Sequence, residues 1–392
     1  MTGSRPDDDV PLDARGPEER SSRTGGGQSG LAPDGGTTLG TIRSSRGPSG
    51  VHTVTLRGTS ITTTQLGFGC AGAFRLPGRA ERRALLDAAY DAGFRHFDVA
   101  PMYGMGRAES ELAPLLARRR DDVTVTTKFG IDVSAIGRAA GAVQMPVRVL
   151  LAKLPRLGTE VQQAGRGPNA GQLGKRLYRS IGYSPEAARS SLDRSLRALG
   201  TDHVDLFTLH DPAGGAGSDA PELIGYLDDQ VRLGRIRCWG IAGDSNVPDG
   251  GLAELIDRAP FLQFRDDLFD DSSHWEGAPD KATMTFGAFG RALPALRGYF
   301  ADDPSEAKVW SDRLGFDVGR SEEVSAMLLR EALRRNRSEP VLFTTTRIGR
   351  LAGAVEGVDG YAAAASAHEH DALVALAAAV RARTPGLVAS DD

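Results

Sequence analysis

Eight short runs rich in β-branched and aromatic residues recur along this chain of 392 residues, and most are followed by a segment with helical periodicity. Strands that alternate with helices are joined by crossovers, which makes the strands parallel. Eight such units favour an α/β fold, the closed (β/α)8 or TIM barrel, and leave a doubly wound open sheet as the alternative. The runs cover residues 64–69, 94–100, 123–129, 204–210, 236–242, 261–268, 282–289 and 340–346.

The intervening segments carry helix signals. Segment 79–93 places Ala84, Leu85, Ala88 and Ala89 on one predicted helical face. Segment 184–200 begins with Ser-Pro, which is typical of a helix start, and ends at a glycine. Residues 270–280 have a poor helix pattern, so the sixth unit is the least defined. Further helices are predicted at 219–234, 321–336 and 366–383.

Segments outside the barrel are predicted at both ends of the sequence. Residues 1–50 are rich in glycine and serine and lack aromatic residues, which predicts a disordered N-terminal tail. Two β-rich runs around Arg57-Gly58-Thr59 predict a β-hairpin before the first barrel strand. We therefore expect one barrel domain over 51–386, followed by a short C-terminal tail, 387–392.

The two longest predicted loops are 131–183, which interrupts the alternation, and 290–320. The first, an insertion after the third strand, has eight Lys/Arg and two acidic residues. It could shape substrate access, with Lys175, Arg176 and Arg179 attracting an acidic or phosphorylated substrate. A solvated variable loop with a helix around 145–155 is the alternative. The second segment is interpreted as a long loop with no recognisable motif.

Composition narrows the class of partner. The 47 Lys/Arg and 51 Asp/Glu give a net charge of −4, which does not favour binding to nucleic acid or to an anionic membrane. Cys70 and Cys238 lie in apolar runs, which favours buried thiols over a disulfide or a metal site. We expect a cytoplasmic protein without a metal, a monomer or small homo-oligomer, that acts on a small molecule.

Four polar residues lie at or just beyond the ends of predicted strands: Asp98, Tyr103, Lys128 and His210. In a (β/α)8 barrel these strand ends meet at one mouth, where the catalytic residues are found. Each residue alone has an ordinary structural explanation, such as a turn cap or a packed aromatic ring. Their coincidence at one mouth instead predicts a catalytic site.

These residue types suit the reduction of a carbonyl, which leaves negative charge on oxygen and needs a proton donor. Tyrosine, with a pKa of about 10, becomes a useful acid when a cation stabilises its phenolate. Lys128 can supply that cation, and Asp98 can neutralise Lys128 inside the barrel. His210 can hydrogen-bond the substrate oxygen and orient it.

The sequence resembles the aldo-keto reductases over roughly residues 52–385 outside the insertion. The resemblance is carried by LGFGCAG, FDVAPMYGMGRAESELA, VTTKFG, VDLFTLHDP, GRIRCWGIAG and FLQF, which occur in the family's order. It implies a (β/α)8 fold, a nicotinamide cofactor across the barrel mouth, and a catalytic tetrad of Asp98, Tyr103, Lys128 and His210. LHDP resembles the sugar-oxidising aldose dehydrogenase branch.

The resemblance also implies contacts to the nicotinamide. Gln263 matches the glutamine that hydrogen-bonds the carboxamide, and Phe286, followed by Gly287, matches the aromatic residue that stacks on the ring. Gly69 and Cys70 are expected to form the floor of the pocket beneath the nicotinamide. The family's Ser-Asn pair after strand five is here Ala242-Gly243, which removes one carboxamide contact, and Asp244 is a candidate replacement.

The segment TTTRIGRLAGAV resembles the family's adenosine-phosphate site. Thr344 stands where a lysine is common, and Thr345 matches the following serine. Arg350 matches the arginine that reads the 2′-phosphate, for which a guanidinium is well suited, and Arg347 is a second candidate. These residues favour NADP(H) over NAD(H).

Two alternative functions remain at this point. Gly67–Gly72 spells G-x-G-x-x-G, the fingerprint of a Rossmann dehydrogenase, but residues 73–78 separate it from the next helix, so no helix N-terminus can cradle a pyrophosphate there. The other alternative is a non-catalytic, nicotinamide-binding regulatory subunit with the same fold. The predicted function is an NADP(H)-dependent oxidoreductase that interconverts an aldehyde, ketone or sugar hemiacetal with its alcohol or lactone.

Overall fold

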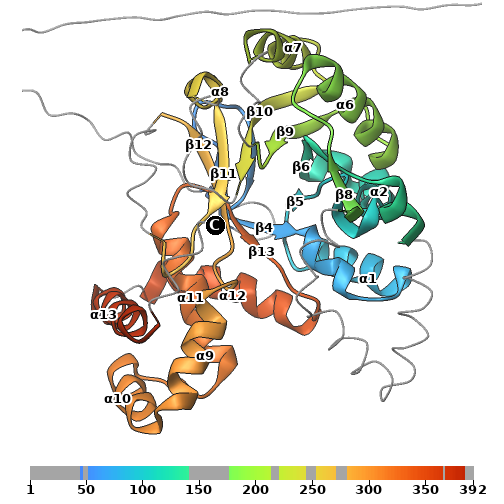
Figure 1. Ribbon diagram of the computed structural model, residues 1–392. Helices are drawn as coiled ribbons and strands as arrows, with labels where there is room; N and C mark the ends of the chain where they lie inside the picture. The colour runs from blue at the N-terminus through green and yellow to red at the C-terminus, as the bar shows by residue number, and fades with distance from the viewer. Residues whose placement is uncertain are drawn as a thin grey trace, which may run out of the picture. The chain divides into compact units, whose positions relative to one another are not determined.

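A closed barrel of eight parallel strands forms the centre of the fold (Figure 1). The computed structural model describes residues 45–46, 52–140, 176–212, 220–243, 253–270, 280–364 and 367–384. The strands pair in the order β10-β11-β12-β13-β4-β5-β6-β9, and β9 pairs with β10 to close the ring. This confirms the (β/α)8 prediction and excludes the open sheet. The strands are β4 (Leu66–Gly69), β5 (His96–Asp98), β6 (Thr124–Phe129), β9 (Val204–His210), β10 (Ile236–Gly243), β11 (Phe261–Arg265), β12 (Ala282–Phe286) and β13 (Val341–Phe343).

Helices surround these strands, and their ends follow local sequence signals. The α6 helix begins after Ser184, whose hydroxyl accepts a hydrogen bond from the Ala187 amide at 3.3 Å, and it ends at Gly200 with φ 68°. The helices packed around the barrel are α1 (Arg79–Asp91), α2 (Ala108–Arg119), α6 (Pro185–Leu199), α7 (Ala220–Arg232), α8 (Ala253–Arg258), α11 (Ser321–Arg335) and α12 (Gly349–Ala364).

The buried face of α1 differs from the predicted one. Ala84 is exposed, and the buried residues include Leu85 and Arg82. Arg82 can be buried because its guanidinium makes two hydrogen bonds to the Glu111 carboxylate, at 2.6 and 2.8 Å. The prediction counted only apolar residues, so it missed an arginine paired with a carboxylate from the neighbouring helix α2.

The predicted hairpin is present as β2 (His52–Thr55) and β3 (Thr62–Thr64), which pair antiparallel. Leu56 and Ile61, at the hairpin turn, pack against Phe261 and Ala282, the first residues of two barrel strands. The hairpin therefore closes the N-terminal end of the barrel. Ser45–Arg46 form β1 and pair with β2, so these two residues of the predicted tail belong to a sheet; the rest of 1–50 lies outside the described residues, as do 387–392.

The segment 290–320 is not a long loop, as the sequence suggested, but two helices, α9 (Ala292–Asp302) and α10 (Pro304–Leu314). With α11 and α13 (Ala367–Arg383) they share a hydrophobic core separate from that of the barrel. Figure 1 shows this orange and red helical layer on one side of the barrel. Its buried side chains include Phe269, Leu296, Tyr299, Phe300, Trp310, Met327 and Leu376.

The insertion 131–183 leaves the barrel as β7 (Ile131–Val133) and returns antiparallel to it as β8 (Tyr178–Ser180). The predicted helix at 145–155 and Lys175 lie outside the described residues. Within the described part of the chain, no helix is long and apolar enough to cross a membrane. The sixth unit contributes β11, and most of its connection to β12, residues 271–279, is likewise not described.

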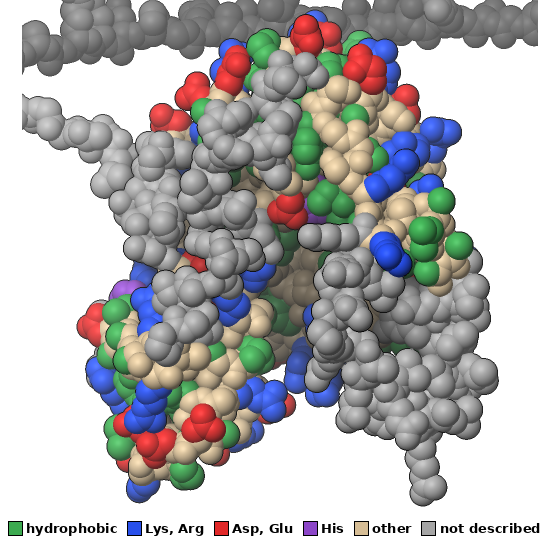
Figure 2. Space-filling model, in the orientation of Figure 1, with side chains coloured by type: hydrophobic (Ala, Val, Ile, Leu, Met, Phe, Trp, Pro, Cys, Tyr) green, Lys and Arg blue, Asp and Glu red, His purple; other side chains and the backbone are tan. Residues whose placement is uncertain are grey.

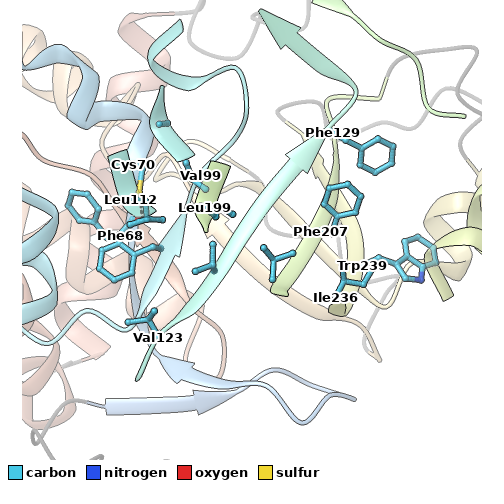
Figure 3. Packing of buried hydrophobic residues seen from close by; sticks show 14 of the residues in the cluster. Phe68, Cys70, Val99, Leu112, Val123, Phe129, Leu199, Phe207, Ile236 and Trp239 are labelled. Carbon is cyan, nitrogen blue, oxygen red and sulfur yellow. Dashed lines mark hydrogen bonds between the residues drawn. The ribbon is translucent and has the colours of Figure 1, made fainter. Parts of the chain in front are cut away.

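The main core lies between the barrel strands and the helices (Figure 3). Phe129 of β6 stacks on Phe207 of β9, with ring centroids 4.8 Å apart and an interplanar angle of 16°. Phe68, Phe94 and Phe97 form a second aromatic group beneath α1. Rigid packing of this kind fixes the ends of β4, β5, β6 and β9, from which polar side chains reach the mouth.

Candidate functional site

The four predicted catalytic residues line one cavity at the C-terminal ends of the strands. Asp98 is the last residue of β5, Lys128 is the last but one of β6, and His210 is the last of β9. Tyr103 begins the short 3-10 turn Tyr103–Met105 after β5. The cavity has a volume of about 640 Å³, and Figure 2 shows the surface hollowed near the centre of this face. Other predicted site residues that line it are Gly69, Gln263, Phe286, Gly287 and Thr344.

Asp98 and Lys128 form a buried ion pair at the floor of the cavity. The Lys128 ammonium donates to Asp98 Oδ2 and lies 3.5 Å from the Val99 carbonyl oxygen. Gln263 Nε2 donates to the same carboxylate oxygen at 3.0 Å. Two buried charges are tolerated when they are paired and also hydrogen-bonded, as they are here. Asp98 therefore fixes both the lysine and the glutamine.

Tyr103 lies beside both Lys128 and His210. The Lys128 Nζ is 5.7 Å from the centroid of the Tyr103 ring. The Tyr103 and His210 rings meet edge to face, with centroids 5.9 Å apart and an interplanar angle of 86°. A phenol, an ammonium group and an imidazole thus surround the same part of the cavity.

His210 is held in its neutral form. Burial, followed by the positive charge of Lys128, lowers the pKa of His210 to about 3, although the Asp98 carboxylate opposes this shift. At neutral pH one ring nitrogen therefore carries a proton and the other accepts a hydrogen bond. Nδ1 is buried and has no hydrogen-bond partner among the described residues.

Two residues that the sequence did not single out shape the end of β9. The hydroxyl of Tyr183 donates to the His210 carbonyl oxygen at 2.7 Å and lies 3.2 Å from that of Asp211. Burial and then the Asp211 charge raise the pKa of Tyr183, so it stays a donor. Asp211 lines the cavity and has φ 44°. The sequence motif LHDP already placed Asp211 next to His210. No local pattern, however, could connect Tyr183 with a strand that ends 27 residues later.

The cavity suits a nicotinamide carboxamide. Gln263 is buried, and its Oε1 has no hydrogen-bond partner within the described part of the chain. A buried amide oxygen without a partner is costly, and an amide N–H of a ligand would satisfy it. The aromatic ring of Phe286 lies on the cavity wall, as stacking on a nicotinamide would require. Ala242 and Gly243 also line the cavity, and Asp244 is outside the described residues.

Cys70 is not brought to the cavity, although the sequence suggested it for the pocket floor. Its side chain is 2% exposed and packs in the main core, and Figure 3 shows its sulfur beside Phe68 and Leu112. The 3-10 helix Cys70–Arg75 begins at this residue, and Cys70 is not among the residues that line the cavity. Burial also raises its thiol pKa. Gly69 does line the cavity, and Thr344 Oγ1 donates to its carbonyl oxygen at 3.1 Å.

A second cavity of about 370 Å³ adjoins the first and shares Thr344 with it. Thr345 and Arg350 line this cavity, and Glu322 stands 4.0 Å from the Arg350 guanidinium. Arg347 donates its backbone N–H to Thr345 Oγ1 and lines neither cavity. The two cavities together offer an extended site, polar at both ends.

The basic residues in the described part of the insertion line neither cavity. Arg176 is exposed, and the Arg179 guanidinium lies 3.7 Å from the Asp132 carboxylate. Neither residue is among the lining residues of the two cavities. In the described part of the insertion, no lining residue of either cavity therefore supports the prediction that these arginines attract an acidic substrate.

Comparisons with known proteins point to one family. Residues 65–248 match the model of the Aldo/keto reductase family. A pyridoxal 4-dehydrogenase from Microbacterium luteolum is 31% identical over 291 residues, which cover 65% of this chain and 78% of that protein. A D-threo-aldose 1-dehydrogenase from a Pseudomonas species is 32% identical over 152 residues, 38% of this chain and 40% of that protein.

Solved structures show the same fold. The holo form of an aldo-keto reductase from Bacillus halodurans superposes with a TM-score of 0.59 at 20% identity, covering 83% of this chain and 95% of that one. A glycerol dehydrogenase from Gluconobacter oxydans gives a TM-score of 0.56 at 18% identity and covers 84% and 95%. At these identities the likeness concerns the fold alone.

Proposed function

The chain belongs to the aldo/keto reductase family, and on that basis we propose that it is an NADP(H)-dependent oxidoreductase. It interconverts an aldehyde, ketone or sugar hemiacetal with the corresponding alcohol or lactone. The observation that carries this proposal is the meeting of Tyr103, Lys128, Asp98 and His210 at one cavity. A nicotinamide cofactor, when bound, would supply reducing equivalents in one direction and accept them in the other.

In this proposal Tyr103 handles the proton. Its hydroxyl donates a proton to the substrate oxygen during reduction and takes it back during oxidation. Lys128 favours the phenolate form because it places a positive charge beside the ring. Asp98 keeps Lys128 in place through their ion pair. Neutral His210 hydrogen-bonds the substrate oxygen and so aligns it with the tyrosine.

The proposed cofactor contacts divide between the two cavities. Gln263 and Phe286 would hold the nicotinamide, with Gly69 and Gly287 allowing close approach of the ring. The φ of Gly287 is 92°, a conformation in which a residue with a Cβ would be strained. Thr344, Thr345 and Arg350 would bind the adenosine end; we assign the 2′-phosphate to Arg350, which lines the cavity, rather than to Arg347.

Steady-state turnover tests the proposal. NADPH consumption with a panel of aldehydes, ketones and sugars, and NADP⁺ reduction with their alcohols, should identify at least one substrate. Tyr103→Phe should lower kcat by about a hundredfold or more, because it removes the proton donor and keeps the ring. Cofactor affinity, measured by fluorescence titration, should stay within about twofold. Cofactor binding without turnover above the Tyr103→Phe background would instead favour the non-catalytic, nicotinamide-binding subunit.

A further inference from the structure

Asp211 adopts a backbone conformation that needs explanation. Its φ is 44°, and among the described non-glycine residues only Met105 shares a positive φ. This region is unfavourable for most L-residues, although Asp and Asn tolerate it best. The conformation is held on both sides: the Asp211 N–H donates to the Ala242 carbonyl oxygen at 2.7 Å, and Tyr183 lies within hydrogen-bond distance of the Asp211 carbonyl oxygen. A constrained residue at a cavity mouth suggests a functional role.

The carboxylate of Asp211 is close to His210 without bonding to it. Asp211 Oδ2 lies 3.8 Å from His210 Nε2, beyond hydrogen-bond distance, and the side chain is 47% exposed. Because burial keeps His210 neutral, the two groups do not form an ion pair at neutral pH. They are nevertheless near enough to bind neighbouring oxygen atoms of one ligand. His210 and Asp211 line the same cavity, so a ligand oxygen on His210 would bring its neighbouring group within reach of Asp211.

Gly243 leaves space beside this carboxylate. A Cβ built at Gly243 would meet Asp211 Oδ1 at 3.4 Å, so a longer side chain would crowd the carboxylate. Both residues line the same cavity. The departure from the Ser-Asn pair, noted in the sequence, therefore opens room for a ligand group to reach Asp211.

We propose that Asp211 is a specificity-determining residue that accepts a hydrogen bond from a hydroxyl on the carbon next to the reacting carbonyl. The inference rests on the proposed function and names its substrate class: α-hydroxy carbonyl compounds, which include the sugars. A carboxylate is a stronger acceptor than a neutral oxygen. A substrate without that hydroxyl would displace water from the carboxylate and offer no donor in return, which lowers its affinity.

A pair of substrates that differ in one hydroxyl tests this inference. The measured quantity is the ratio of kcat/KM for 2-hydroxypropanal to that for propanal, in the parent protein, Asp211→Asn and Asp211→Gly. Asn and Gly both tolerate a positive φ, so the backbone is preserved. Asp211→Gly should lower the ratio by about tenfold or more, and Asp211→Asn by less, because its amide oxygen still accepts. Asp202→Asn, an exposed residue before the other end of β9, is the matched control and should leave the ratio unchanged.

The outcomes separate this inference from the proposed function. An unchanged ratio in active Asp211→Asn and Asp211→Gly proteins overturns the inference and leaves the oxidoreductase proposal intact. If the parent turns over no carbonyl substrate, the proposed function fails, and the hydroxyl contact is then measured by ligand-observed NMR with propane-1,2-diol and propan-1-ol. A diol preference that is lost in Asp211→Gly still supports the contact, whereas equal binding of the two alcohols overturns it.

Discussion

At the scale of single residues, Arg350 is the residue to which we assign the 2′-phosphate in the proposed function. Its guanidinium lines the second cavity, but it shares that site with Glu322, whose carboxylate lies 4.0 Å away and is well exposed. An exposed pair at this distance contributes little to stability. A 2′-phosphate would compete with Glu322 for the guanidinium and would also be repelled by the carboxylate. We therefore expect a moderate rather than absolute preference for NADPH.

Arg350→Ala should lower kcat/KM for NADPH by roughly tenfold, because a charge-assisted hydrogen bond is lost, and should change that for NADH by less than about twofold. The matched variant Arg347→Ala removes an exposed arginine that lines neither cavity and should leave the NADPH to NADH ratio unchanged. The ratio is obtained from initial rates with each cofactor. If only Arg347→Ala moves it, the phosphate is bound by Arg347 instead.

At the scale of elements, the Tyr183 side chain ties the return of the insertion to the end of β9. Tyr183, between β8 and α6, donates to the end of β9 and packs over Gly130, where an added Cβ would come 2.1 Å from the Tyr183 ring. Its ring also lies 6.0 Å from that of Phe129 at the end of β6. The return of the insertion therefore positions His210 and Asp211.

Tyr183→Phe should lower kcat several-fold while cofactor affinity stays within about twofold, since the lost hydrogen bonds orient His210 but do not contact the cofactor site. Tyr178→Phe, in β8 of the same insertion, is the control and should leave kcat unchanged. Steady-state rates give kcat, and stopped-flow measurements of cofactor binding give the cofactor affinity. Equal loss of kcat and cofactor affinity would point to general unfolding of the mouth and would contradict a positioning role.

The sequence predicted those elements that local signals define. The strand predicted at 204–210 and the helix predicted at 184–200 agree with β9 and α6 to within a residue, because an apolar run and two helix caps mark them. The helices of 290–320 were missed because Pro294 and Gly298 in α9, and the many charges of α10, hide their apolar faces. Tyr183 was missed because its role depends on a distant contact that no local pattern records.

At the scale of the whole molecule, the buried His96 makes the free energy of unfolding depend on pH. Burial lowers the pKa of His96 to about 4, and its ring nitrogens lie 2.9 and 3.1 Å from the hydroxyls of Thr124 and Thr126. The unfolded chain binds this proton near pH 6.5, so stability falls as the pH drops from 6.5 toward 4. Glu339 has the opposite effect on stability. Burial raises its pKa to about 7, so the folded state binds this proton more tightly and the free energy of unfolding rises as the pH falls through that value.

Comparison with His96→Asn isolates the histidine because Glu339 and His210 are present in both proteins. The parent should lose about 1.4 kcal/mol more stability per pH unit than His96→Asn between about pH 6 and 4.5. Urea unfolding at a series of pH values provides the measurement. Parallel stability curves for the two proteins over this interval would show that His96 is not buried in its neutral form.

The cavity wall is supported by two hydrophobic cores, that of the barrel and that of the helical layer of α9, α10, α11 and α13. Gly290, Leu293 and Pro294 line the mouth from the start of this layer, whereas the tetrad is anchored in the barrel core. The two cores meet at Phe289 and along α11, so changes in one are expected to leave the other undisturbed only where the changed residue shares no partner with it. Laboratory evolution of this chain could therefore vary the positions of 290–320 that lie away from this shared part to recruit new substrates, while the proposed proton-transfer residues keep their support.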